Sequence, residues 1–384
     1  MSTVPLDDLE AVRDRLARSP GELTPHRVAE ALRETGRPVG DATVLAVYET
    51  LRRDVVGAGP LEPLLRTPHV TDVLVNGADH VYLDRGSGLE LTPVRFPDEE
   101  AVRRLAQRLA ALGGRRLDDA TPYVDLRLPD GTRFHAVLAP LARPGTLVSL
   151  RVPRQRTFDL DELVGLGTLT PDTARIVRAI VDARLAFLVS GGTGSGKTTL
   201  LAALLSLVAA DERIVLVEDA SELRPDHPHV VALEGRPPNI EGAGAVEVRA
   251  LVRQALRMRP DRLVVGEVRG GEVVDLLAAL NTGHEGGCGT LHANSALDVP
   301  ARVEALALAA GLGRDAAHSQ LASAVHAVLH LARGPDGARR LREVAVPERG
   351  ADGLVSMISA LRVDDDGRAV PGPGAAALAS RLDR

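Results

Sequence analysis

The order of apolar and polar positions divides the chain into a mixed first part and a regularly alternating second part. Between residues 57 and 152, short apolar runs surround one stretch, about 98–112, in which Val102, Leu105 and Leu109 follow helical spacing. The strand-like runs lie at 70–76, 81–84, 89–96, 124–128, 133–139 and 146–152. Strands around a single helix predict a small α+β domain over residues 57–152.

From residue 163 onward, apolar strands alternate with amphipathic helical patterns. Helices are predicted at 171–183, 246–258, 270–281, 297–310 and 314–325, and strands at 185–189, 213–217, 229–233, 262–265, 289–291 and 327–332. This alternation is typical of a parallel α/β nucleotide-binding core. We expect the core to occupy residues 163–363, with two or three further strands in its last part.

Three segments lack the patterns of these two domains. Residues 1–56 show short helical patterns broken by Pro20, Pro25 and Pro38, which predicts a small helical appendage. Residues 153–162 are charged and without periodicity, so we interpret them as a linker. Residues 364–384 are rich in Gly, Pro, Ala and Asp, and this composition predicts a disordered tail.

The stretch 190–200, SGGTGSGKTTL, has the spacing of a phosphate-binding loop between a strand and a helix. Its glycines allow backbone N–H groups to turn toward phosphate oxygens, and the following helix adds its positive end. Lys197 is expected to reach the β- and γ-phosphates, and the Thr198 hydroxyl to hold Mg²⁺. Lys197 is also the only lysine of the chain. The predicted nucleotide-binding residues are Gly191, Gly192, Thr193, Gly194, Ser195, Gly196, Lys197, Thr198 and Thr199.

Two further apolar strands end in acidic residues. LVVGEVRGGE (263–272) has the Walker B arrangement and brings Glu267 to a strand end, and RIVLVEDASEL (213–223) does the same for Glu218 and Asp219. Hydrolysis needs a carboxylate that orients or deprotonates the attacking water. We expect Glu218 and Glu267 to share Mg²⁺ coordination and water activation, with the division between them left open. Asp219 is a further candidate of this acidic pair, with a capping or solvated acid as the alternative interpretation.

Histidine and arginine positions complete the candidate chemistry. His292, in GTLHANS, follows a short strand of the same core, where we expect it to sense the γ-phosphate. His284, in NTGHEGG, fits a site or a surface position equally well. An arginine stripe, formed by Arg249, Arg253 and Arg257, lies along one helix face and is interpreted as solvated.

Composition narrows the function classes. A net charge of −6 argues against a broad nucleic-acid-binding surface, so no direct nucleic-acid contact is expected. The single Cys288 excludes a disulfide framework and a four-cysteine zinc site. No signal peptide and no membrane-spanning apolar run are visible, which favours a cytoplasmic protein.

The combined motifs resemble the type II/type IV secretion ATPase superfamily, in the branch called CpaF or TadA, the assembly ATPases of Flp-type (tight adherence) pili. The resemblance rests on GGTGSGKTTL, RIVLVEDASEL, PHVVALEGRPPNIEGAG, ALRMRPDRLVVGEVRGGE, NTGHEGG and GTLHANS, and in the first domain on GAGPLEPLL, VTDVLVNG, YVDLRLPDGTRFHAVLAPL and SLRVP. The absence of a tetracysteine zinc module argues against the branch that contains type II secretion and type IV pilus extension ATPases.

This resemblance implies a RecA-like P-loop NTPase core hinged to the smaller α+β N-terminal domain, with ATP bound between them and six subunits in a ring. The acidic box of the family then falls on Glu218–Glu222, Walker B on Glu267 and the histidine box on His292. Arg127, Arg133 and Arg151 match arginines that close on the phosphates. The ring would lie at the cytoplasmic face of the inner membrane, associated peripherally through polytopic platform proteins, and would drive pilus assembly or protein export.

Two other functions stay open at this point. One is an ATPase of conjugal transfer or a RecA-like DNA translocase, for which single-stranded DNA would stimulate ATP turnover. The other is a nucleotide-gated assembly protein that does not hydrolyse ATP. The complete set of Lys197, Thr198, Glu218 and Glu267 argues against this second alternative.

Overall fold

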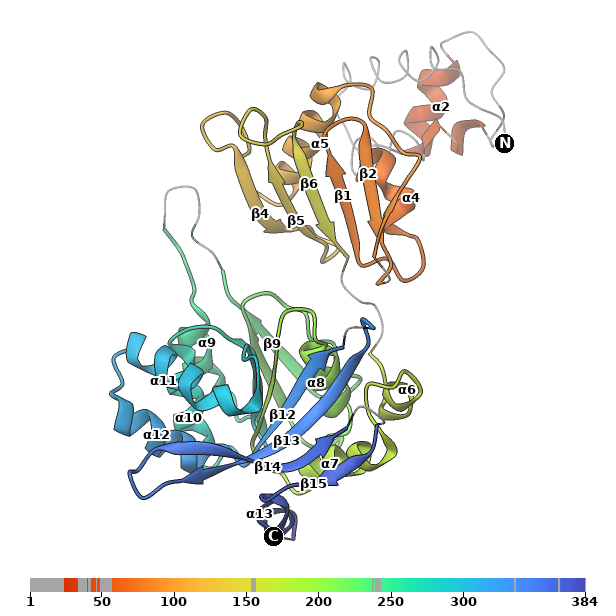
Figure 1. Cartoon of the computed structure of the whole chain (residues 1–384). Coiled ribbons are helices and arrows are strands. Elements are labelled where there is room, and N and C mark those ends of the chain that lie inside the picture. Colours follow the sequence, from red (N-terminus) through yellow and green to blue (C-terminus); the bar gives the residue numbers. More distant parts are fainter. Residues whose placement is uncertain are drawn as a thin grey trace. The chain divides into compact units, whose positions relative to one another are not determined.

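The computed structural model describes residues 24–33, 40, 43–45, 47–48, 57–86, 88–152, 157–236, 238, 243–334, 336–364 and 367–383. Two compact units divide the chain, Met1–Arg154 and Gln155–Arg384, and each is considered by itself (Figure 1). Most of the predicted helical appendage lies outside the described residues, apart from α2 (Pro25–Arg33) and a few neighbouring positions. Within the described ranges, no helix has the length and apolar character needed to cross a bilayer.

The first unit contains a six-stranded antiparallel sheet with helices on one face, which confirms the predicted α+β domain. The strand order is β3-β2-β1-β6-β5-β4. The strands are β1 (Asp72–Asn76), β2 (His80–Asp84), β3 (Leu89–Leu91), β4 (Tyr123–Arg127), β5 (Arg133–Val137) and β6 (Leu147–Arg151). Helix α5 (Glu99–Leu112) begins after Asp98, whose carboxylate accepts the N–H of Ala101 at 2.7 Å. The short helices η1 (Gly59–Leu61) and α4 (Glu62–Leu65) precede the sheet.

Alternation along these strands explains which face the described helices cover. Val73 and Val75 of β1 and Val148 of β6 are at most 1% exposed, and they pack with Leu105 and Leu109 of α5. The intervening residues of the same strands point to the opposite face, because successive side chains of a strand alternate between faces. That opposite face carries charged side chains, which are considered below with the candidate site.

The second unit is built on a nine-stranded sheet in the order β15-β14-β13-β12-β7-β11-β10-β8-β9. The strands are β7 (Phe187–Gly191), β8 (Ile214–Glu218), β9 (Val230–Glu234), β10 (Arg262–Val268), β11 (Cys288–Leu291), β12 (Ala327–Arg333), β13 (Arg339–Arg349), β14 (Val355–Val363) and β15 (Ala369–Pro371). The run from β12 to β9 is parallel, and β13–β15 extend it in antiparallel fashion. This is the predicted parallel α/β core.

Helices cover both faces of this sheet. One apolar cluster joins it to α6 (Leu160–Gly165), α7 (Pro171–Asp182), α8 (Lys197–Leu205) and α13 (Ala375–Leu382), and the other to α9 (Val248–Ala255), α10 (Glu272–Leu280), α11 (Val299–Ala309) and α12 (Arg314–Ala324). All residues of β7, β8 and β11 are buried. Strands covered on both faces have continuous apolar runs, and these runs made the core recognisable in the sequence.

Two predicted boundaries differ from the structure. The predicted linker 153–162 includes the start of α6, where Asp159 and Glu162 form a capping box with bonds of 2.7 and 3.0 Å. The predicted disordered tail is wrong for β15 and α13. Leu378 of α13 is 4% exposed in the core, and Arg381 donates to the Pro347 carbonyl at 3.2 Å. Composition alone cannot reveal such contacts, because they form with residues distant in sequence.

Candidate functional site

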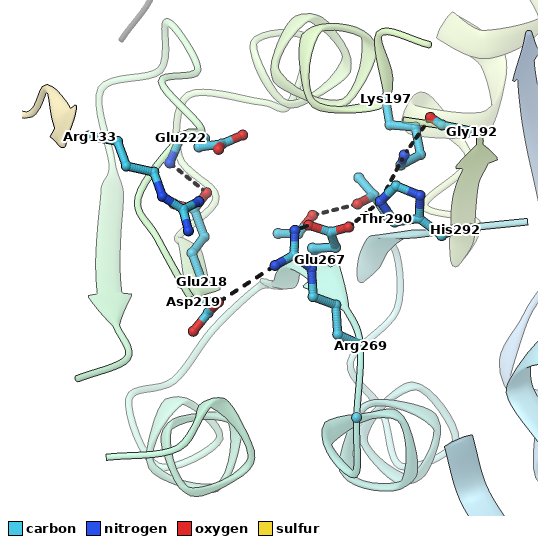
Figure 2. Close-up of polar contacts among 12 residues, drawn as sticks. Arg133, Gly192, Lys197, Glu218, Asp219, Glu222, Glu267, Arg269, Thr290 and His292 are labelled. Carbon is cyan, nitrogen blue, oxygen red and sulfur yellow. Dashed lines mark hydrogen bonds and ion pairs between the residues drawn. The ribbon is translucent and has the colours of Figure 1, made fainter. Parts of the chain in front are cut away.

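The predicted site residues of the second unit come together at the carboxyl edge of its parallel strands. Strands β7, β8 and β10 run in the same direction, so the phosphate loop, Glu218 and Glu267 all emerge on one side. His292 follows the end of β11 on that same side. Ligand sites of open α/β sheets lie at this edge. Figure 2 shows Lys197, His292 and Glu267 directed toward one another, with Glu218 beside Glu222.

The phosphate loop has the backbone geometry of an anion-binding turn. Gly194 and Gly196 adopt φ angles of 69° and 97°, a region that favours glycine. A Cβ on Gly191 would lie 2.4 Å from the carbonyl oxygen of Leu331, so the loop also needs close backbone approach there. Helix α8 starts after Gly196, and its first bond runs from the Leu200 N–H to the Gly196 carbonyl. The N–H groups of its first turn therefore have no intrahelical acceptor and can bind an anion.

Lys197 lies folded inside this loop, where it is 7% exposed. Its Nζ donates to the carbonyls of Gly191 at 3.1 Å and Gly192 at 3.0 Å, and lies 3.4 Å from Nε2 of His292. Burial lowers the pKa of the ammonium, while the nearby Glu267 carboxylate raises it. The ammonium is held by two carbonyls that phosphate oxygens can replace as acceptors.

Glu218 is 3% exposed at the end of β8. Its Oε1 accepts the N–H groups of Glu222 and Leu223, each at 2.9 Å, whereas its buried Oε2 has no hydrogen-bond partner among the described residues. Burial raises the pKa of this carboxyl group despite those two bonds. A Cβ on Gly266 of β10 would lie 2.6 Å from Glu218 Cγ, so the side chain runs directly over this glycine. An orphaned carboxylate oxygen suits a hard cation.

Glu267 stands at the centre of a chain of charged groups. Its carboxylate forms ion pairs with Nε2 of His292 and with the guanidinium of Arg269, and that guanidinium also lies 3.8 Å from Asp219 Oδ2 (Figure 2). Burial, and next the Lys197 charge, lower the pKa of His292. The sequence analysis missed Arg269. Its only signal was its position two residues after Glu267 at the end of the same strand.

The three predicted arginines lie in the first unit and form one row across its sheet. Arg127 of β4 is registered opposite Arg133 of β5, which is opposite Arg151 of β6. Arg133 donates to Asp125 at 2.8 and 3.2 Å, and Arg151 to Asp72 at 3.2 Å. Sheet register thus collects three separate sequence positions into one basic row. Their approach to phosphates stays a prediction.

The remaining candidates belong to other parts of the second unit. His284 precedes β11 and lies near its amino end, at the opposite edge from the phosphate loop, with Nδ1 3.2 Å from the Ala279 carbonyl. Arg249 and Arg253 each donate to Asp275 at 2.7 Å and link α9 to α10. These arginines therefore take part in a contact between helices in addition to the solvent exposure that the sequence predicted for the stripe.

No group of three or more His, Cys, Asp or Glu side chains suited to hold a metal is present among the described residues. Thr198 lies half-buried in the first turn of α8, and Thr193 is exposed at the loop tip. Ser195 is 2% exposed, and its hydroxyl has no hydrogen-bond partner within the described part of the chain. The loop thus contains a buried hydroxyl beside the start of α8.

Comparison with known proteins agrees with this architecture. The chain is 58% identical over 332 residues to a putative conjugal transfer protein of Mycobacterium tuberculosis strain H37Rv, covering 85% of this chain and 94% of that protein. It is 32% identical over 290 residues to the probable conjugal transfer protein TrbB of Sinorhizobium fredii, covering 74% and 85%. The crystal structure of the pilus retraction motor PilT with bound ADP has the same fold, with a TM-score of 0.53, 20% identity and coverage of 74% and 81%.

The family profile described as "Type II/IV secretion system protein" matches residues 54–357. That range includes the whole sheet of the first unit and all of the parallel strands of the second unit. The chain therefore belongs to the type II/IV secretion system protein family, the family of the secretion ATPases.

Proposed function

We propose that this protein hydrolyses ATP and that hydrolysis drives the export of a macromolecule or the assembly of a pilus. The observation that carries the proposal is the position of Lys197. Its ammonium lies inside a glycine loop at the carboxyl edge of the sheet, 3.4 Å from His292, which in turn is paired with Glu267. A phosphate-binding cation, a polar sensor and an acid thus meet where the γ-phosphate of a bound nucleotide would lie.

Mg²⁺ is the metal that this donor set fits. The orphaned Oε2 of Glu218 and the Thr198 hydroxyl would hold it together with phosphate oxygens, since Mg²⁺ in such sites takes few protein ligands. When bound, the ion would neutralise charge on the β- and γ-phosphates. Lys197 would bind the same oxygens, and the imidazole of His292 would face the terminal phosphate. Glu267 is the candidate base, because its carboxylate lies between His292 and Arg269.

The family resemblance suggests that the arginine row of the first unit also contacts the phosphates of the nucleotide. Guanidinium groups bind phosphate oxygens through paired hydrogen bonds, and three of them in one row offer more donors than one phosphate needs. The extra guanidinium donors are consistent with arginines that bind different phosphate oxygens at different stages of the ATP hydrolysis cycle. We further propose a ring of six such subunits at the cytoplasmic face of the inner membrane, in contact with polytopic platform proteins.

Purified full-length protein tests the enzymatic part. We expect Mg²⁺-dependent phosphate release that Lys197→Ala abolishes, and Glu267→Gln to keep nucleotide binding while most turnover is lost. Arg175→Ala removes an exposed cation of α7 that pairs with Asp172, and serves as the matched control. Wild-type turnover in the Lys197→Ala variant would exclude this site. Retained turnover in Glu267→Gln would transfer the role of base to Glu218.

The identity of the transported macromolecule distinguishes pilus assembly from conjugal transfer. The resemblance to CpaF and TadA favours assembly of Flp-type pili, whereas the names of the two relatives favour conjugal transfer. Copurification with two polytopic membrane proteins, without stimulation by DNA, would support pilus assembly or protein export. Stimulation of ATP turnover by single-stranded DNA, declining steeply with salt, would instead support a DNA translocase.

A further inference from the structure

The β12–β13 hairpin brings a second basic segment to the phosphate loop. Strand β12 pairs in parallel with β7, and Leu331 lies opposite Gly191, where the loop begins. The hairpin continues beyond that point and returns at Arg339, which is registered opposite Arg333. The turn of the hairpin therefore extends past the end of β7, beside the loop. No phosphate-loop motif contains these residues.

Arg339 makes direct contact with the loop. Its Nε donates to the Gly194 carbonyl at 2.9 Å. A Cβ on Gly196 would lie 3.4 Å from Arg339 Cδ, so the aliphatic part of the arginine packs across this glycine. The two glycines are the loop residues with φ angles of 69° and 97°. Arg339 thus contacts two of the glycines of the loop that have positive φ angles.

The charge of Arg339 is not neutralised within the hairpin. Asp336 is the only acid between residues 333 and 342, and it binds Arg340 through two bonds of 2.6 and 3.0 Å. This pairing, with help from the Ala338 N–H, lowers the pKa of Asp336 to about 2. Among the described residues, the terminal nitrogens of Arg339 have no hydrogen-bond or ion-pair partner. A guanidinium with unused donors therefore lies against a loop built to bind anions.

We propose that Arg339 is a further nucleotide-binding residue, whose terminal nitrogens contact the phosphates of the bound nucleotide while its Nε holds the Gly194 carbonyl. The proposal rests on the nucleotide binding proposed above. Arginine suits both tasks at once, because its planar fork has five donors and one of them is already occupied by the loop. The contact would come from the same unit as the loop, independently of Arg127, Arg133 and Arg151.

The substitution Arg339→Gln separates the proposed phosphate contact from the hydrogen bond to the Gly194 carbonyl. The amide nitrogen of Gln occupies the place of Nε in Arg, so Arg339→Gln keeps a donor for the Gly194 carbonyl and removes the terminal nitrogens. Arg339→Ala removes both. Arg349→Ala is the matched control, because Arg349 lies at the other end of β13 and its Nε donates to the Gly353 carbonyl at 3.2 Å.

Affinity of the full-length protein for a fluorescent ADP analogue, with Mg²⁺, is the measurement. We expect Arg339→Ala and Arg339→Gln each to weaken binding about tenfold or more, the effect of losing a hydrogen bond to a charged group, with the melting temperature without nucleotide unchanged. Arg349→Ala should bind like the wild type. Wild-type affinity in Arg339→Gln would overturn the phosphate contact and leave only a bond to the loop.

Comparison with Lys197→Ala shows whether a negative result refutes only the role of Arg339 or also the proposed nucleotide site. If the wild type binds the analogue, Lys197→Ala loses binding and Arg339→Ala binds within about twofold of the wild type, only the role of Arg339 is refuted. If the wild type binds no nucleotide, or Lys197→Ala binds normally, the proposed nucleotide site fails and the inference about Arg339 fails with it.

Discussion

Gly266 is predicted to control the position of the buried carboxylate of Glu218. The three atoms nearest to a Cβ on Gly266 all belong to the Glu218 side chain, and the closest, Cγ, would be at 2.6 Å. Carbon atoms in contact are about 3.5–4.0 Å apart, so Gly266→Ala would force Cγ to retreat by about 1 Å. The bonds from Glu222 N and Leu223 N, both 2.9 Å long, would then exceed hydrogen-bonding distance.

The expected cost follows from these two effects. Overpacking a core position costs about 1–3 kcal/mol, and a lost hydrogen bond to a charged group about 1.5–3 kcal/mol, partly regained if the freed groups reach water. We expect Gly266→Ala to reduce the free energy of unfolding of the second unit by about 3 kcal/mol. For a unit that spans residues 155–384, this corresponds to a melting temperature lower by about 6–12 °C.

A double-mutant cycle tests the assignment of this cost. Glu218→Ala removes Cγ, so adding Gly266→Ala in that background should change stability by less than about 0.5 kcal/mol. Gly165→Ala, at the end of α6 with no atom within 4 Å of the new Cβ, is the control for glycine replacement in general. Thermal and denaturant unfolding give the four free energies. An equal loss in both backgrounds would refute the contact with Glu218, and a melting temperature within about 2 °C of the wild type would refute the clash itself.

Three other predictions concern stability and its relation to turnover. Burial raises the pKa of Glu218, so the wild type loses stability as the pH rises from the ordinary pKa of a glutamate through that raised pKa. Glu218→Gln should therefore have a higher melting temperature than the wild type at pH 8 and lose this advantage at pH 4. A difference in melting temperature that does not depend on pH would contradict the raised pKa of Glu218. Arg133→Ala breaks an exposed pair with Asp125, so we expect under about 1 kcal/mol of destabilisation but a strong loss of ATP turnover. Asp125→Ala is the variant that breaks the same pair and keeps the guanidinium, and equal turnover in the two variants would argue against a phosphate role. Arg262→Ala removes a guanidinium that is 2% exposed and deprives half-buried Glu212 of bonds of 2.7 and 3.0 Å, while Arg184 stays 3.2 Å from the same carboxylate. We expect a cost of about 1.5–3 kcal/mol in denaturant unfolding, whereas a loss below about 1 kcal/mol would show that water and Arg184 replace the pair.

The order of elements was readable from the sequence because the signals are local. The covered strands appear as continuous apolar runs, and the phosphate loop requires glycine at fixed spacing from one lysine. Parallel strands place their carboxyl ends on one edge, so strand ends at Glu218, Glu267 and His292 were enough to predict that these residues share an edge with the loop. Each of these predictions needs only residues close in sequence and one rule of sheet geometry.

The tail shows the limit of composition. Residues 369–382 contain Gly, Pro and Ala in amounts that suit a disordered segment, yet they form a strand and a helix. Leu378 reaches the core, and Arg381 bonds to the Pro347 carbonyl. The pairing of β15 with β14 depends on a strand that is itself placed by β13, so the order of the tail follows from the sheet that precedes it.

Local sequence patterns predicted the order of the two domains, the phosphate loop, and the acids and the histidine that share its edge. Contacts between side chains became visible with the folded structure. Sheet register aligned Arg127, Arg133 and Arg151, ion pairs joined Arg269 to Glu267, and a hairpin more than a hundred residues after the loop brought Arg339 to Gly194. The physical reason is that such contacts depend on strand pairing and helix packing between distant segments, which no local periodicity encodes.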